Sequence, residues 1–219
     1  RLQGIYKPGS YNIDTLDSSQ PVSGAIIGLS LLYNDSEIFI REQPSIPYVL
    51  LTAHLANQFG AQITYDKQNT LWHIKGVGSL QGINCTIEGD WSSASLWLAA
   101  AALHGSITID NLNITSNQPD RQLLELLTRY GADITVTAPK SSNELPQPAA
   151  TTFRSESLSI TAHTRNAFIF NCRDTPDLFP AACLLAAGCI ETSSIYGIEN
   201  LTGKESNRVE AIVTILEKL

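Results

Sequence analysis

A carboxylate directly ahead of a small-residue apolar segment is the first candidate for chemistry. Asp177 begins the stretch DLFPAACLLAAG, which has the composition of a buried helix, and Asp174 lies three residues upstream. A carboxylate at the start of a helix is stabilised in its ionised form by the helix dipole, and it commonly caps the helix. The same group can take a proton from a substrate hydroxyl as a general base. The segment by itself favours the cap, and both interpretations stay open.

The charged run GKESNR, which contains Lys204, Glu205 and Arg208, is the second candidate. The apolar period from Val209 to Leu216 predicts that this run forms the first turn of a helix. Cations there oppose the helix dipole at a cost of a few tenths to about 1 kcal/mol each. Lys204 and Arg208, spaced i, i+4, could hold a dianion together with free backbone N–H groups. The alternative is a solvated turn in which Glu205 offsets the dipole; acidic helix starts elsewhere in the chain favour the anion site.

Hydroxyl groups mark two further helix starts. Ser18, Ser19 and Gln20 precede the apolar stretch PVSGAIIGLSLL, where serine hydroxyls and free N–H groups could bind an anion. Simple capping is the alternative, and it is the expected role of Ser92 and Ser93 at the corresponding helix of the next repeat.

A third start, PSIPYVLL, places Ser45 and Tyr48 on either side of Pro47, which suits the first turn of a helix. Tyr48 taken alone fits a half-buried interface aromatic better than a ligand contact.

The elements that must position these residues recur three times. Each copy has a polar helix start and a small-residue apolar helix (17–32, 89–105 and 177–188), then a β-branched strand (36–42, 105–112 and 192–198). In the first two copies an amphipathic helix follows and closes at Gly60 or Gly131 before another strand. The units therefore read β-α-β-α-β-β, an α/β architecture of small sheets backed by helices, with the third copy incomplete.

Two segments interrupt the repeats. A boundary is expected in residues 76–89, between the first copy and the other two. The polar, proline-rich segment 139–152 is expected to be a loop or hairpin excursion. The Ala-rich helices are expected to lie buried inside the assembly.

Composition excludes several function classes. The net charge of −7 gives no broad basic field for nucleic acid or an anionic membrane. The four cysteines have neither CxxC pairs nor metal-type spacing, which favours a reduced, cytoplasmic chain. No apolar stretch reaches the length of about 20 residues that a membrane helix needs. Because the chain starts at Arg1 and contains no Met, it is expected to be a piece of a longer polypeptide.

With these residues in view, the chain resembles the 5-enolpyruvylshikimate-3-phosphate synthase family (3-phosphoshikimate 1-carboxyvinyltransferases). The carriers, in order, are DSSQPVSGAI, SIPY, GDWSSASLWLAAAAL, PDLFPA and GKESNRVEAI, the last similar to the family's Lys-Glu-(Ser/Thr)-Asp-Arg signature. The resemblance implies an inside-out α/β barrel of two domains, each of three β-α-β-α-β-β units, with the active site in the cleft between them. Residues 1–88 then resemble the end of one domain, and residues 89–219 part of the other.

The resemblance also implies a reaction and its residues. The family transfers the enolpyruvyl group of phosphoenolpyruvate to the 5-hydroxyl of shikimate 3-phosphate, in aromatic amino acid biosynthesis, without a metal or organic cofactor and as a monomer. Asp177 matches the base for the 5-hydroxyl, and Glu205 a proton-transfer residue for the enolpyruvyl carbon. Arg208 matches a phosphoenolpyruvate ligand. Contacts to the shikimate phosphate or the bound substrates are implied for Ser18, Ser19, Gln20, Ser45, Tyr48, Asn200 and Lys204.

The chain also departs from the family pattern. Asn207 stands where the family usually has Asp, and Ile46 where Lys is frequent. The family's Lys-Ser and Arg ligands of the N-terminal part, and its later Arg and Lys, have no counterpart here. Electrostatic stabilisation by such groups is usually the largest catalytic contribution. The 219-residue chain alone is therefore predicted to bind shikimate 3-phosphate weakly and to turn over little or nothing.

Two other functions stay open from the sequence. One is the related enolpyruvyl transfer to a UDP-amino sugar, which shares the repeat but not the Lys-Glu-Ser-Asn-Arg run. The other is a non-catalytic repeat scaffold in which the Ser and Asp residues only cap helices.

Overall fold

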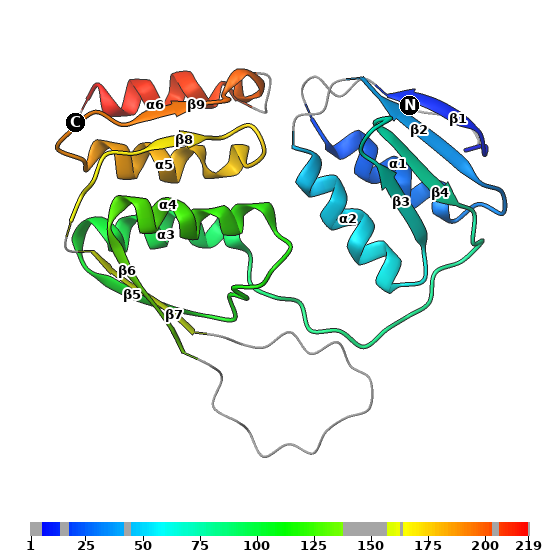
Figure 1. Ribbon diagram of the computed structural model, residues 1–219, viewed down its shortest axis with the longest axis horizontal. Helices are drawn as coiled ribbons and strands as arrows, with labels where there is room; N and C mark the ends of the chain where they lie inside the picture. The colour runs from blue at the N-terminus through cyan, green and yellow to red at the C-terminus, as the bar shows by residue number, and fades with distance from the viewer. Residues whose placement is uncertain are drawn as a thin grey trace, which may run out of the picture. The chain divides into compact units, whose positions relative to one another are not determined.

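The computed structural model describes residues 6–13, 18–41, 45–137, 157–162, 164–202 and 206–218. Its contacts divide the chain into two compact units, Arg1–Ile83 and Asn84–Leu219 (Figure 1). The division falls within residues 76–89, where the sequence suggests a boundary. That the two units belong to different domains of a longer enzyme stays a prediction.

The first unit follows the β-α-β-α-β-β order. Its elements are β1 (Ser10–Ile13), α1 (Gln20–Ser30), β2 (Ser36–Ile40), α2 (Ile46–Gln58), β3 (Gln62–Asp66) and β4 (Leu71–Lys75). The sheet has the order β1-β2-β4-β3, with β1 parallel to β2 and the other neighbours antiparallel. A parallel pair needs a crossover connection, which α1 supplies. The predicted repeat is confirmed in this unit.

The core of the first unit lies between the two helices and the sheet. Ile26 of α1 and Val49 of α2 pack in one cluster with Ile38, Trp72 and Ile74 of the strands, all at most 3% exposed. Helix α2 ends at a turn where Gly60 has φ of +93°, a conformation that glycine adopts without a steric penalty. The end predicted there is therefore confirmed.

The second unit contains two further copies of the repeat. Its elements are α3 (Trp91–His104), β5 (Ser106–Asp110), η1 (Pro119–Gln122), α4 (Leu123–Tyr130), β6 (Ala132–Thr137), β7 (Ser157–Ala162), β8 (Ile169–Asn171), η2 (Pro176–Leu178), α5 (Phe179–Ala187), β9 (Ser194–Tyr196), η3 (Glu199–Leu201) and α6 (Arg208–Leu216). One sheet is antiparallel in the order β5-β7-β6, and the other is the parallel pair β8-β9.

Two details of the second unit differ from expectation. Within the described residues, no strand precedes α3; the segment ahead of it makes only an isolated bridge at Cys85. Gly131 ends α4 with φ of +98°, as predicted. The segment 139–152 lies outside the described residues.

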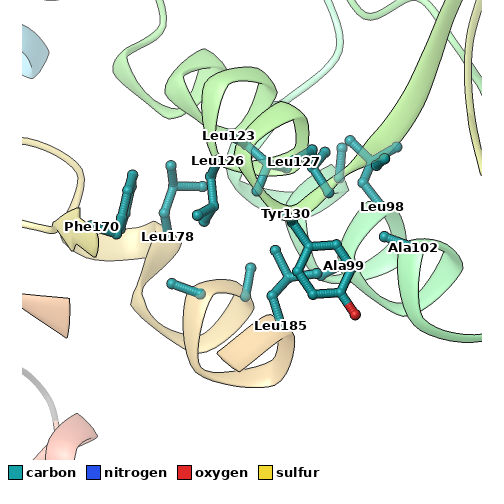
Figure 2. Packing of buried hydrophobic residues seen from close by; sticks show 14 of the residues in the cluster. Leu98, Ala99, Ala102, Leu123, Leu126, Leu127, Tyr130, Phe170, Leu178 and Leu185 are labelled. Atoms are coloured by element: carbon teal, nitrogen blue, oxygen red, sulfur yellow. The ribbon is translucent and has the colours of Figure 1, made fainter. Parts of the chain in front are cut away.

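The core of the second unit joins its two repeats. Figure 2 shows three leucines of α4 (Leu123, Leu126, Leu127) facing Leu178 and Leu185, and all five are fully buried. Small residues such as Ala99 on α3 and Ala182 on α5 belong to the same cluster and let these helices approach closely.

The expected burial of the Ala-rich helices holds for only one face of α3. Trp91 and Leu98 are fully buried, whereas Leu96 and Trp97 on the same helix are 49% and 66% exposed. The sequence LWLAAAAL carries no polar face that would distinguish these positions, so composition alone overestimates their burial.

Two buried thiols should make the stability of the second unit depend on pH in the alkaline range. Burial, reinforced by the nearby Cys183, raises the pKa of Cys172 from 9.0 to about 12, and burial raises the pKa of Cys183 from 9.0 to about 11. Above pH 9 the unfolded chain releases these protons while the folded chain retains them. The free energy of unfolding should therefore be insensitive to these thiols below pH 9 and fall between pH 9 and 11, by about 1.4 kcal/mol per pH unit for each thiol.

Urea unfolding at several values from pH 8 to 10.5 measures this slope. Cys172→Ala should roughly halve it, and Cys85→Ala, which removes an exposed thiol, should leave it unchanged. Equal slopes in the wild type and in Cys172→Ala would contradict the expectation.

Candidate active site

The predicted ligand residues of the first unit gather at one edge of its sheet. Strands β1 and β2 are parallel, and Ile13 pairs with Ile40 where both strands end. Ser18 and Ser45 each lie five residues beyond those paired ends. Ser18 lies just before the N-terminus of α1, and Ser45 is the N-cap residue of α2. The parallel register therefore brings two helix N-termini, from distant parts of the sequence, to the same edge.

The start of α1 separates the roles of its two serines. Ser18 Oγ accepts a hydrogen bond from the backbone N–H of Gln20 at 3.2 Å, so this hydroxyl serves the helix start as a simple cap does. Ser19 occupies the N-cap position but its side chain makes no capping hydrogen bond. The exposed side chain of Gln20 stands beside them. The hydroxyl of Ser19 is thus not used by the helix, and helix N-termini attract anions.

The start of α2 is strained at a buried serine. Ser45 is 4% exposed and has φ of +63° and ψ of +34°, a left-handed conformation that is uncommon for a residue other than glycine. Its side chain makes no capping hydrogen bond, and Tyr48 in the first turn is half-buried. Backbone strain of this kind costs of order 1–3 kcal/mol and concentrates at functional sites.

Helices α1 and α2 are tied together close to these starts. Thr52 Oγ1 donates to Ser23 Oγ at 3.0 Å, and the same hydroxyl lies 3.0 Å from the Tyr48 carbonyl oxygen. This contact fixes one helix start relative to the other within the unit.

The corresponding helix start of the second unit is capped, but by Asp90 rather than by the predicted Ser92 and Ser93. Asp90 accepts hydrogen bonds from the backbone N–H groups of Ser92 and Ser93 at 3.0 and 3.2 Å. The Ser92 hydroxyl donates to buried Asp120. These hydroxyls and amides are occupied by the protein itself, so nothing here marks an anion site.

Three predicted residues of the second unit follow the parallel pair β8-β9. Asn171 pairs with Tyr196 where these strands end; Asp177 follows β8 within η2, and Asn200 and Arg208 follow β9. Gly197 has φ of +72°, and a Cβ at this residue would lie 2.1 Å from Asn171 Oδ1. Only glycine lets the two strand ends approach this closely.

Asp177 and Arg208 form an ion pair. Arg208 Nη1 donates to Asp177 Oδ1 at 2.5 Å, across a separation of 31 residues. The two side chains are 29% (Arg208) and 38% (Asp177) exposed, so both can be reached from solvent. The interpretation of Asp177 as a helix cap is wrong, because neither η2 nor α5 has a side-chain cap.

The helix that carries Arg208 begins later than predicted. Asn207 is extended, and its Oδ1 accepts from the Glu210 backbone N–H at 3.2 Å, so α6 starts at Arg208 rather than near Lys204. The Asn207 Nδ2 group also lies 3.2 Å from Glu210 Oε2. An Asp here would retain the cap but would face a second carboxylate. The prediction that the helix includes the residues directly ahead of Arg208 is therefore wrong, and Lys204, its predicted i, i+4 partner, lies outside the described residues.

Several predicted residues need separate mention. Lys204 and Glu205 lie outside the described residues. The side-chain oxygen of Asn200 is buried and has no hydrogen-bond partner within the part of the chain that the structure describes. Buried polar atoms are nearly always paired, so such an oxygen points to a ligand or a water molecule.

Two general features of the described residues bear on the class of site. Among them, no group of three or more His, Cys, Asp or Glu side chains is arranged to hold a metal ion. None of the described helices has the length and apolar character needed to cross a membrane.

Comparisons with known proteins place the whole chain in one family. A family profile described as EPSP synthase (3-phosphoshikimate 1-carboxyvinyltransferase) matches residues 3–219. The 3-phosphoshikimate 1-carboxyvinyltransferase of Clostridium acetobutylicum is 32% identical over 220 residues, which cover 100% of this chain and 47% of that protein. The protein of the same name from Methanospirillum hungatei is 31% identical over 223 residues, covering 100% of this chain and 49% of the relative. The chain thus spans about half the length of the curated relatives it matches.

Solved structures share the fold. EPSP synthase from Acinetobacter baumannii has a TM-score of 0.67 at 20% identity, with 98% of this chain and 45% of that chain covered. The enolpyruvyl transferase NikO from Streptomyces tendae has a TM-score of 0.57 at 17% identity, with 85% and 44% covered. At these identities the likeness concerns the fold, an incomplete α/β structure of repeated units.

Proposed function

Because the chain belongs to the 3-phosphoshikimate 1-carboxyvinyltransferase family, we propose that it forms part of an enzyme that transfers the enolpyruvyl group of phosphoenolpyruvate to the 5-hydroxyl of shikimate 3-phosphate. The experiments below use a polypeptide that contains this chain and has the full length of its relatives; we call it the completed enzyme. The reaction belongs to aromatic amino acid biosynthesis. The four free cysteines support a cytoplasmic location.

The observation that carries the proposal is the pair formed by Asp177 and Arg208, whose facing atoms are 2.5 Å apart. A carboxylate that accepts a hydroxyl proton and a guanidinium that holds an anionic co-substrate must stand side by side for this transfer. Both side chains are partly exposed; Asp177 lies in η2, after β8, and Arg208 begins α6, after β9. A scaffold of helix caps does not account for them, because neither residue serves as a cap.

Asp177 is proposed to take the proton of the 5-hydroxyl as that oxygen attacks the enolpyruvyl carbon. Its carboxylate is paired with Arg208 in the structure. The phosphate and carboxylate groups of phosphoenolpyruvate offer the guanidinium a bidentate partner, which a charge-assisted pair favours. Binding of the co-substrate would draw Arg208 away from Asp177 and free the carboxylate for proton transfer. Glu205 is proposed to exchange a proton with the enolpyruvyl carbon.

The remaining proposed contacts hold the phosphorylated acceptor. Ser19 and Ser45 at the two helix starts of the first unit, with Ser18, are proposed ligands of the shikimate phosphate. Gln20, Tyr48, Asn200 and Lys204 are proposed to contact the bound substrates. The Ser19 hydroxyl, which does not cap the helix, and the buried Asn200 oxygen, which has no hydrogen-bond partner among the described residues, support these roles.

A phosphate-release assay on the completed enzyme tests the proposal. Release should require both phosphoenolpyruvate and shikimate 3-phosphate, and a UDP-amino sugar should not replace the acceptor. Release with the sugar nucleotide alone as acceptor would favour the related transfer. The isolated 219-residue chain should release little or no phosphate; near-normal turnover by this chain would contradict that expectation without affecting the assignment of the reaction.

Ser45 offers a test of the proposed phosphate contact. Ser45→Gly relieves a left-handed backbone, so the free energy of unfolding should stay constant or rise by up to about 1 kcal/mol. The same change removes the hydroxyl and should weaken binding of shikimate 3-phosphate by the completed enzyme about 10- to 150-fold, the loss of one hydrogen bond to a charged group. Urea unfolding and calorimetric titration measure the two effects.

Thr70→Gly is the matched control. Thr70 also has a positive φ, of +51°, and lies in the turn between β3 and β4. This change should raise stability without altering ligand affinity. Equal affinities of the Ser45→Gly variant and the wild type would remove Ser45 from the proposed contacts.

A further inference from the structure

The turn that carries Asp177 is held locally by its own backbone. Thr175 N donates to the Cys172 carbonyl oxygen at 3.1 Å, and Leu178 N donates to the Thr175 carbonyl oxygen at 3.0 Å. Pro176, between them, has no N–H to donate. These bonds shape the turn within residues 172–178, but they do not tie it to the neighbouring repeat.

Two side chains make that tie, on either side of Asp177. Leu178 is fully buried in the core with the leucines of α4 (Figure 2). Thr175 is 1% exposed, and its Oγ1 donates to Gln122 Oε1 at 3.2 Å across 53 residues of sequence. The Thr175 hydroxyl does not cap η2. Pro176 and Cys172 of the same turn are buried as well. Apolar packing is not directional, so the hydrogen bond adds a directional contact between the turn and η1.

We propose that Thr175 and Gln122 are positioning residues for Asp177. They hold the turn, and through it the carboxylate, in line with Arg208 and with the acceptor hydroxyl. This inference rests on the proposed function, because it assigns to the pair an effect on the proton-transfer step. A displacement of about 1 Å at a reacting group can lower the rate by about 10²-fold.

A cavity lined in part by Gln122 helps to separate this role from a merely structural one. The cavity has a volume of about 190 Å³ and is lined by Gln122, Glu125, Arg129, Asn171 and Tyr196, among others. If the Thr175 hydroxyl is removed, a water molecule in this polar cavity can bond to the Gln122 oxygen, because the space and the polar partners suffice. Stability should then change little, while the direct link to the turn is lost.

The test in the completed enzyme is Thr175→Val, which keeps the shape of the side chain and removes its hydroxyl. We expect kcat to fall about 10- to 100-fold, with KM for both substrates within about twofold and a melting temperature within about 4 °C of the wild type. Thr175→Ser restores the hydroxyl and should recover kcat. Gln122→Met should lower kcat by a similar factor, and the double variant should be no slower than either single variant.

Thr128→Val on α4 is the matched control, since its hydroxyl donates to the Leu124 carbonyl oxygen of the same helix at 2.8 Å. Its kcat should equal that of the wild type. An unchanged kcat in Thr175→Val, additive effects of the two single variants, or no recovery by Ser would each overturn the inference.

A measurement on the 219-residue chain itself does not depend on turnover. The Nη–H signal of Arg208 in a nitrogen-15 spectrum reports its pairing with Asp177, because the contact is made through Nη1. Thr175→Val should move this signal toward its position in Asp177→Asn, and Thr128→Val should not. An unmoved signal in Thr175→Val would overturn the inference whatever the enzyme does; absent turnover in the wild-type completed enzyme would overturn the proposed function instead.

Discussion

Replacing Asp177 by Asn in the completed enzyme should lower kcat by about 10²- to 10⁴-fold, the contribution typical of general acid–base catalysis. The amide can still accept the hydrogen bond from Arg208 but cannot take the 5-hydroxyl proton. The ion pair is partly exposed, and such pairs contribute about 0–1 kcal/mol to stability, so the variant should remain folded. Steady-state phosphate release measures the rate, and thermal unfolding confirms the fold.

Asp174→Asn removes the same charge from an exposed carboxylate three residues away and should leave kcat within about twofold of the wild type. Two outcomes would assign Asp177 a structural role and favour the non-catalytic scaffold: equal losses of activity in the two variants, or a loss of stability in Asp177→Asn that matches its loss of rate.

The second large effect is expected at Arg208. Arg208→Gln should lower kcat/KM for phosphoenolpyruvate by about 10²- to 10³-fold. This is the usual effect of removing one preorganised hydrogen-bond donor that stabilises negative charge on a substrate or in the transition state. Arg208→Lys should give an intermediate loss, because an ammonium retains the charge but lacks the planar fork that binds two oxygens at once. Initial rates at varied phosphoenolpyruvate and saturating shikimate 3-phosphate give the comparison.

Arg129→Gln is the charge-matched control. The Arg129 guanidinium donates to the Ile169 carbonyl oxygen at 3.2 Å and lies 4.0 Å from Glu125, on α4. Its loss should leave KM for phosphoenolpyruvate unchanged. An equal rise of KM in both variants would mean that net charge, rather than a specific contact at Arg208, determines the affinity.

Local sequence signals predicted the order of elements well. The β-α-β-α-β-β order, the helix ends at Gly60 and Gly131 and the capped start of α3 follow from propensities that act over a few residues. The predicted start of α6 is wrong. The charged run suggested a first turn at Lys204, but Asn207 supplies a better cap, and the helix begins after it.

The pairings that build the site could not be read from sequence. The partners in the Asp177–Arg208 ion pair are 31 residues apart, and those in the Thr175–Gln122 hydrogen bond 53 residues apart. Their proximity depends on the parallel register of β8 and β9 and on packing between repeats, neither of which leaves a local trace. Part of the negative charge that faces the start of α6 is supplied by Asp177 of the chain itself.

Each unit has a hydrophobic cluster drawn only from its own residues, from Val22 to Ile74 in one and from Trp91 to Leu201 in the other. Segments with separate cores can lose their structure in separate cooperative steps. A calorimetric scan of the chain would then resolve two endotherms, and a ligand that binds one unit would displace one peak. Trp72, buried at 1% exposure, would report unfolding of the first unit by its emission, while buried Trp91 would report that of the second.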